Sequence, residues 1–193
     1  MQELAGEEVL VKPEQMGNYI VSIAEGYVGE MEIPGNSGFK SRIFEVDMRS
    51  VGWQPGYSWC AYFAKLVWLH CYHSAPKHVE TLKKLMVGGA VATFNNFKEQ
   101  SEPKHFQVAG IPAPGALVVW QHVGSWQGHI GLVKETANFG FFSTIEGNTS
   151  VNGGRNGDRV AEHGHSLNEV NAKTGLRLLG FVYPCNHQPT DLV

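Results

Sequence analysis

The pattern of apolar residues changes from helical to strand-like at the Pro-Ala-Pro-Gly turn of residues 112–115. Before this turn, apolar residues recur at the spacing of amphipathic helices, and after it, short segments rich in β-branched and aromatic residues indicate strands. Helices followed by a meander of strands predict an α+β fold. We expect helices over residues 14–29, 39–51, 59–72, 79–87 and 91–100, and strands over 116–121, 129–135, 141–146 and 176–183.

The helix expected over residues 59–72 is apolar almost all round, with only Lys65 and His70 clearly polar. Such a helix is buried on most faces, so we expect it to be central and packed on an antiparallel sheet. Ser58 stands at the N-cap position. The glycine-rich residues 147–165 are expected to form an irregular excursion before the last strand.

Composition indicates one domain. The chain has 193 residues, of which 42% are hydrophobic and 17% charged, enough for a sizeable core. We expect a leader over 1–13, a folded domain over 14–185 and a tail over 186–193. The net charge of −3 argues against a nucleic-acid binder. No apolar run approaches the roughly 20 residues that span a bilayer, and no signal peptide is visible at the start.

The three cysteines are odd in number and irregularly spaced, which disfavours a disulfide framework and leaves a free thiol. Cys60 falls in the first turn of the expected central helix, where the helix dipole and unpaired N–H groups lower a thiol pKa. The same N–H groups can bind an oxyanion. Position alone nevertheless favours an inert, buried Cys60, because most buried cysteines act as small hydrophobes.

A hairpin gives His129 a polar neighbour. With a two-residue loop at 137–138, His129 faces Glu146, and directly opposed Cβ atoms lie about 4.5–5.5 Å apart. With the loop one residue later, Asn148 faces His129. Glu146 and Asn148 share one face of the strand, so both registers supply an oxygen to the imidazole. A three-residue loop would pair His129 with Gly147 and break the arrangement.

A histidine oriented by a carboxylate or amide can serve as a general base, and a thiol at a helix start completes a cysteine hydrolase. The chain has nine histidines. Residue types alone therefore do not separate this site from a chance arrangement.

Four segments in the correct order resemble the CHAP family, the cysteine, histidine-dependent amidohydrolases/peptidases. Residues 55–63, Pro-Gly-Tyr-Ser-Trp-Cys-Ala-Tyr-Phe, resemble its nucleophile segment. Residues 128–133 resemble its histidine strand, and residues 145–149 the strand end that supplies acidic and amide partners. Residues 112–118 resemble its turn into the first strand. The resemblance runs from about residue 16 to 184.

The resemblance implies a papain-like fold, with residues 14–185 as the catalytic domain. It also implies that Cys60 attacks, that His129 is the base, and that Glu146 and Asn148 orient the imidazole. The implied substrate is bacterial peptidoglycan or its peptide fragments. The implied activity is that of an N-acetylmuramoyl-L-alanine amidase, or that of an endopeptidase that cleaves the stem peptide or the cross-bridge. One departure is the region 76–107, which is longer than a minimal CHAP domain needs.

The oxyanion site and the substrate groove are less defined. The backbone amide of Cys60 is one expected oxyanion donor, and Gln54 is either a second donor or an exposed turn residue. Trp53, Trp59 and Trp126 could stack on sugar or stem, although core packing is the default for Trp59.

Two other functions stay open: a non-catalytic relative that binds cell-wall polymer, and a papain-like protease or acyltransferase with another substrate. We expect no cofactor and no metal. The pairs Cys71/His73 and Cys185/His187 lack the spacing of structural zinc sites, and no cluster of aspartates precedes Cys60 to bind calcium. We expect a monomer that acts at the bacterial envelope after export, secretion or phage-mediated release.

Overall fold

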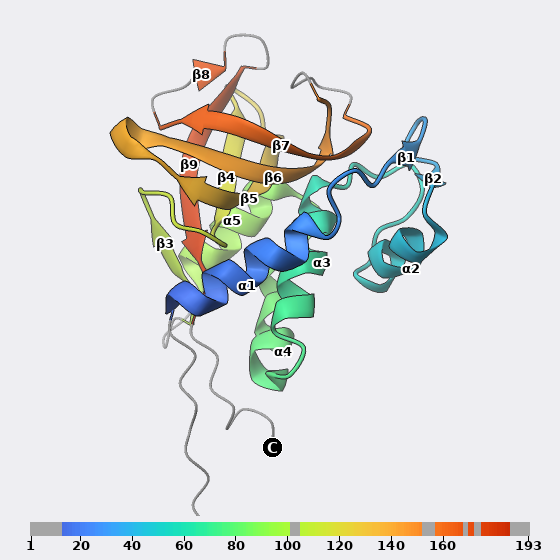
Figure 1. Ribbon diagram of the computed structural model, residues 1–193, viewed down its shortest axis with the longest axis horizontal. Helices are drawn as coiled ribbons and strands as arrows, with labels where there is room; N and C mark the ends of the chain where they lie inside the picture. Colours follow the sequence, from blue (N-terminus) through green and yellow to red (C-terminus); the bar gives the residue numbers. More distant parts are fainter. Residues whose placement is uncertain (1–12, 101–104, 152–156, 168–169, 172–174, 186–193) are drawn as a thin grey trace, which may run out of the picture.

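The computed structural model describes residues 13–100, 105–151, 157–167, 170–171 and 175–185, so most of the expected leader and the whole expected tail lie outside the described residues. The described residues form five α-helices, all before the strands of the main sheet (Figure 1). All five expected helices are present, with ends shifted by up to four residues. They are α1 (Pro13–Glu25), α2 (Arg42–Ser50), α3 (Cys60–Cys71), α4 (Pro76–Leu85) and α5 (Ala90–Glu99).

The main sheet is antiparallel and seven-stranded, with the order β3-β9-β4-β5-β6-β7, and β8 pairs with β9. A separate hairpin pairs β1 with β2. The α+β prediction is confirmed. The strands are β1 (Glu32–Ile33), β2 (Gly38–Phe39), β3 (Gln107–Ala109), β4 (Leu117–His122), β5 (Gly128–Thr136), β6 (Phe141–Thr149), β7 (Arg159–Ser166), β8 (Val170–Asn171) and β9 (Leu176–Tyr183).

The strand β7 corrects one expectation, because it lies in the segment 147–165 that we expected to be irregular. It pairs with β6, with Glu146 opposite Ala161 and Phe142 opposite His165. The sequence of β7 is mostly polar and contains Gly164, whereas β-strand propensity is highest for β-branched and aromatic residues. The sequence therefore did not indicate a strand here. An end strand of the sheet can carry such residues because only one of its edges is paired in the main sheet.

The helix α3 packs against β5 and β6, and α1 and α5 cover neighbouring parts of the same sheet (Figure 1). Phe63, Val67 and Trp68 of α3 are fully buried. Burying one such side chain contributes about 1.5–3 kcal/mol of transfer free energy. The buried side chains of α3 therefore hold the helix, and with it Cys60, in a fixed position against the sheet.

The opposite face of the sheet carries a second apolar cluster, which includes Val118, Trp120, Val133, Phe142 and Phe181. Alternation along each strand separates the two faces of the sheet. Two of its rings, Trp120 and Phe142, contact histidines that are described in the next subsection.

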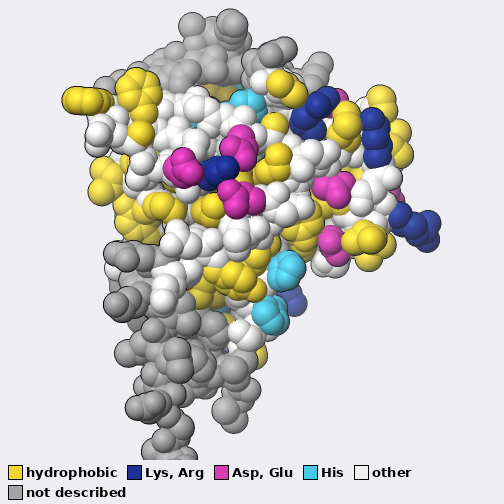
Figure 2. Space-filling model, in the orientation of Figure 1, with side chains coloured by type: hydrophobic (Ala, Val, Ile, Leu, Met, Phe, Trp, Pro, Cys, Tyr) yellow, Lys and Arg dark blue, Asp and Glu magenta, His cyan; other side chains and the backbone are white. Residues whose placement is uncertain are grey.

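The surface carries both signs of charge, and acidic and basic side chains are interspersed on the face shown in Figure 2. Lys134 of β5 pairs with Glu25 of α1 at 3.0 Å and with Glu162 of β7 at 2.8 Å. Among the residues described, no helix has the length and apolar character needed to cross a membrane.

Candidate active site

Cys60 is the first residue of α3 and is only 8% exposed. We expected Ser58 to be the N-cap, but the N-cap is the next residue, Trp59. The side chain of Trp59 makes no hydrogen bond that caps the helix. The amide of Trp59 instead donates to Oδ1 of Asn148 at 2.8 Å. A residue 89 positions away thus fixes the start of the helix that carries the thiol.

The β5–β6 connection differs from the expected two-residue loop at 137–138. It contains a 3₁₀ turn over 138–140, where Phe139 has φ 61, and a pairing shift between Val133 and Glu135. On the His129 side of that shift, Leu132 pairs with Ile145. This is the second of the two registers considered above, in which residue 148 lies opposite residue 129. Residue 146 then lies diagonally across from residue 129, within reach of long side chains.

His129 and Glu146 are joined across this diagonal. Nε2 of His129 lies 2.7 Å from Oε2 of Glu146, whose side chain is 4% exposed. The second carboxylate oxygen, Oε1, accepts from Oγ1 of Thr144 at 2.6 Å and lies 2.7 Å from Nε2 of His165. The carboxylate is thus held at both oxygens, and Nδ1 of His129 is left to face the thiol with which the imidazole is hydrogen-bonded.

The charges in this group reinforce one another. Burial raises the pKa of the Glu146 carboxyl, but the charge of His129 and bonds from His129 and His165 bring it well below its usual range. Burial lowers the pKa of His129, but the Glu146 carboxylate and the bond to Cys60 raise it above its usual value. Both shifts favour an anionic Glu146 beside a protonated imidazole.

Burial also raises the pKa of the Cys60 thiol, yet the opposing effects are stronger. The hydrogen bond and charge of His129 lower this pKa, and so do bonds from the backbone N–H groups of Ile130 and Ala61. The pKa of Cys60 is therefore below the usual range. The arrangement favours a thiolate–imidazolium pair, in which a thiolate is the reactive nucleophile.

Asn148 does not bond to the imidazole. Its Nδ2 donates to the carbonyl of Gly157 at 2.8 Å, and its Oδ1 accepts from Trp59. The backbone of Asn148 has φ 56, and the β6–β7 pairing shifts between Glu146 and Thr149. The expectation that residues 146 and 148 share one face assumed a regular strand, and this irregularity turns the Asn148 side chain toward α3.

Three residues around Glu146 were missed in the sequence. Thr144 and His165 bond to its carboxylate. Trp120 stacks on His129 with ring centroids 6.0 Å apart and lies against His165 in a tilted arrangement at 4.7 Å. The sequence contains a His-Gly-His run at 163–165, but only the pairing of β7 with β6 brings His165 to the Glu146 carboxylate. That pairing could not be recognised while β7 was expected to be a loop.

Other expected site residues lie elsewhere. Gln54 is exposed, and its carbonyl accepts from the amide of Tyr57 at 3.1 Å, so it stands in a turn. Trp53 and Trp59 are 1% and 0% exposed and belong to the core, so neither can stack on a substrate, whereas Trp126 is 79% exposed. Within the described parts of the chain, no three His, Cys, Asp or Glu side chains are placed to hold a metal ion.

A buried cysteine at the start of a helix, packed on an antiparallel sheet that carries the histidine, is the arrangement that the resemblance to the CHAP family implies. A family model, the CHAP domain, matches residues 52–148, which is half of the chain, and the chain belongs to this family. The matched region contains Cys60, His129, Glu146 and Asn148. By class the chain is a cysteine peptidase or amidase.

One of two similar solved structures shares the fold. The crystal structure of a wild-type endolysin, LysIME-EF1, matches 88% of this chain and 64% of that chain, with 18% identity and a TM-score of 0.51. The crystal structure of Ly7917 matches 87% of this chain and 62% of that one, with 12% identity and a TM-score of 0.49. The chain thus spans less than two thirds of the length of either protein. No curated protein matches it in sequence.

Proposed function

We propose that this chain hydrolyses amide bonds in the peptide part of bacterial peptidoglycan, with Cys60 as nucleophile and His129 as base. The observation that carries the proposal is the connected series of bonds from Cys60 through His129 to the buried Glu146. Membership of the CHAP family supports the reaction class. The similarity to the endolysin LysIME-EF1 supports the cell wall as substrate.

The reaction begins with the thiolate–imidazolium pair. The Cys60 thiolate attacks the carbonyl carbon of the amide, and the carbonyl oxygen becomes an oxyanion. The backbone N–H of Cys60, at the positive end of α3, helps to bind this oxyanion.

His129 then transfers its proton to the leaving nitrogen, and the carbon–nitrogen bond breaks. This leaves an acyl thioester on Cys60 and frees the amine. The neutral imidazole takes a proton from water, which attacks the thioester and releases the carboxylic acid. Glu146 keeps the imidazole oriented and stabilises its charge throughout, while Asn148 holds the start of α3 through Trp59.

We assign the segment around the α4–α5 turn to one wall of the substrate groove. A Cβ added to Gly88 would lie 2.5 Å from the hydroxyl of Tyr62, two residues after Cys60. A Cβ added to Gly128, just before His129, would lie 2.7 Å from Cγ2 of Val91. These close contacts place Gly88 against Tyr62 and Val91 against Gly128, which are sequence neighbours of Cys60 and His129.

The test is loss of turbidity of purified bacterial cell walls by the intact chain, the C60A variant and the matched control C71A. We expect the intact chain and C71A to clear the walls and C60A to leave them turbid. Clearing by C60A at the rate of the intact chain would reject the proposal, as would walls left unchanged by all three.

Mass analysis of the released muropeptides then identifies the bond. A cut between muramic acid and the first amino acid releases a whole stem and defines an amidase. A cut within the stem or cross-bridge defines an endopeptidase. Thiol-dependent hydrolysis of ordinary proteins together with intact muropeptides would instead identify a papain-like protease.

A further inference from the structure

The carboxylate of Glu146 is bound by two histidines from different strands. His129 of β5 lies 2.7 Å from Oε2, and His165 of β7 lies 2.7 Å from Oε1. Thr144 donates to Oε1 as well, at 2.6 Å. The proposed reaction uses only the first of these histidines, so the second requires its own explanation.

The charge of Glu146 fixes what His165 does. The pKa of this carboxyl is held well below its usual range, so the group is an anion that can only accept hydrogen bonds. Nε2 of His165 therefore carries a hydrogen and donates it. A hydrogen bond to a charged group is shorter and about twice as strong as one between neutral groups.

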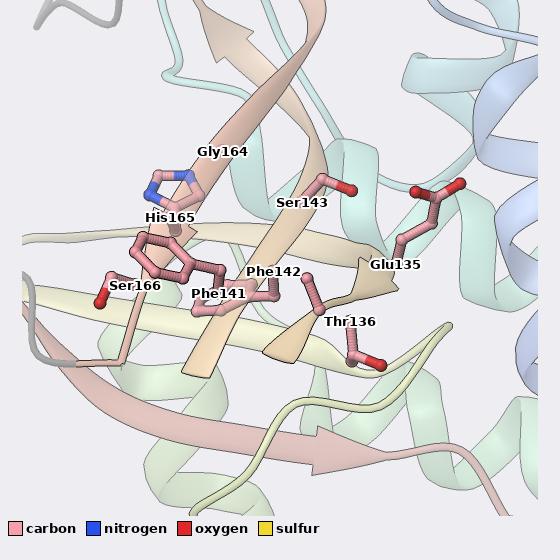
Figure 3. Close-up of a pocket in the computed structure, with 9 residues that line it drawn as sticks. Glu135, Thr136, Phe141, Phe142, Ser143, Gly164, His165 and Ser166 are labelled. Carbon is pink, nitrogen blue, oxygen red and sulfur yellow. The ribbon is translucent and has the colours of Figure 1, made fainter. Parts of the chain in front are cut away.

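The ring of His165 is itself held in place. Its centroid lies 4.7 Å from that of Trp120 and 5.6 Å from that of Phe142. Figure 3 shows His165 leaving β7 beside the Phe141–Phe142 end of β6, at an open pocket of about 550 Å³. Trp120 also stacks on His129 at 6.0 Å, so one indole supports both imidazoles.

We propose that His165 is a positioning residue for the reaction. Its Nε2–H anchors Oε1 of Glu146, which keeps Oε2 directed at His129 and so maintains the imidazolium beside the Cys60 thiolate. The reaction that this serves rests on the proposed function. The thiolate–imidazolium pair of Cys60 and His129 does not depend on a substrate, so it can be measured in the free protein.

The test compares H165F and H165L, which remove the donor, with H165Q, which restores an N–H at a similar reach. H165F also keeps a flat ring against Trp120, so it preserves packing if H165L does not fold. The readout is the rate of Cys60 alkylation by iodoacetamide against pH, assigned by peptide mass mapping. Melting temperatures show that each variant is folded.

We expect H165F and H165L to raise the apparent pKa of Cys60 alkylation by about one unit, the size expected for the loss of one charge-assisted hydrogen bond. At saturating cell wall their initial rate should fall about 10-fold with KM nearly unchanged, because the orientation of the base is lost and not substrate binding. H165Q should return the alkylation profile to within a few tenths of a unit.

Two further variants serve as comparisons. T144V removes the other donor to Oε1 and should shift the profile in the same direction. H163L removes an imidazole two residues earlier on β7 that bonds Thr149, and whose pKa burial lowers, and it should leave the profile in place. His163 is a second histidine of β7 that interacts electrostatically with Glu146. The H163L variant therefore measures how much the charge of His163 affects the pKa of Cys60.

Superimposed profiles for H165F and the intact chain would overturn the proposal. So would an H165Q profile shifted as far as that of H165F, because the restored N–H donor would then fail to restore the low pKa of Cys60. If the intact chain fails to clear cell walls, the proposed function is wrong, while the alkylation profiles still decide the role of His165.

Discussion

The two ends of α3 each carry a cysteine, and the two thiols differ in chemistry although both are buried. Cys60 begins the helix at 8% exposure and Cys71 ends it at 2%. The pKa of Cys60 is lowered, whereas burial and the nearby Cys185 raise the pKa of Cys71 to about 12. Burial is thus nearly constant, and the neighbours decide which thiol ionises.

The neighbours of the two sulfurs explain the difference. Cys60 meets His129 and the backbone N–H groups of Ile130 and Ala61, all of which stabilise a negative charge. Sγ of Cys71 lies 3.1 Å from Sδ of Met16, a soft and uncharged partner. The helix dipole adds to the contrast, since its positive end is at Cys60 and its negative end at Cys71.

The largest expected effect separates these two cysteines directly. C60A removes the nucleophile and should lower cell-wall hydrolysis by at least about 10³-fold, because the remaining groups cannot form the acyl intermediate. C71A should keep the rate per folded molecule within about twofold and lower the free energy of unfolding by about 1 kcal/mol, a typical value for a point substitution. Initial turbidity rates and urea unfolding measure the two quantities.

The contrast would fail if C71A lost activity in proportion to C60A while remaining folded. Such a result would show that the end of α3, and not its start, carries the reacting thiol. Replacing Cys185 by Ala in the same series controls for the third cysteine.

The second largest expected effect concerns Glu146, whose carboxylate is hydrogen-bonded to His129. E146Q keeps the size of the side chain but removes the charge that raises the pKa of His129. We expect the hydrolysis rate to fall on the order of 10²-fold, because the imidazolium charge is no longer stabilised and the ring is no longer held in its orientation. The alkylation rate of Cys60 at neutral pH should fall with it. Unchanged alkylation in folded E146Q would show that the thiolate does not depend on this carboxylate.

The pH dependence of alkylation sharpens the comparison between the two ends of α3. The thiolate–imidazolium pair exists above the lowered pKa of Cys60 and below the raised pKa of His129. Cys60 should therefore react with iodoacetamide well below pH 8.5, the usual thiol pKa, and Cys71 should stay unmodified up to about pH 10. Peptide mass mapping at each pH separates the sites. Equal labelling of both cysteines at pH 7 would contradict the assignment.

The helical half of the fold and the position of Cys60 at a helix start could be predicted from the sequence, because each depends on local signals. The apolar segment that follows Trp59 identifies α3, and it places Cys60 at a helix start. The β-branched strands and their intervening turns identify β4, β5 and β6. The CHAP resemblance then relates Cys60 to His129, which no local pattern could bring together.

The remainder could not be predicted, because it depends on departures from regular structure. The pairing shift after Val133 and the left-handed turn at Phe139 set the register, and neither has a distinct local signature. The positive φ of Asn148 redirects its side chain, which alternation along an ideal strand does not anticipate. His165 was missed because β7 is polar, and its bond to Glu146 is a contact between strands.

The smallest expected effect tests the irregular end of β6. N148A removes the oxygen that accepts from the amide of Trp59, so it should lower the free energy of unfolding by about 1 kcal/mol, the usual cost of a lost helix cap. The hydrolysis rate should fall less than in E146Q, because Asn148 acts on the position of Cys60 through the helix start and not on the charge of His129. N148D keeps the accepting oxygen and should recover most of the stability. A rate loss in N148A equal to that in E146Q, with unchanged stability, would instead mean that Asn148 contacts the imidazole during the reaction.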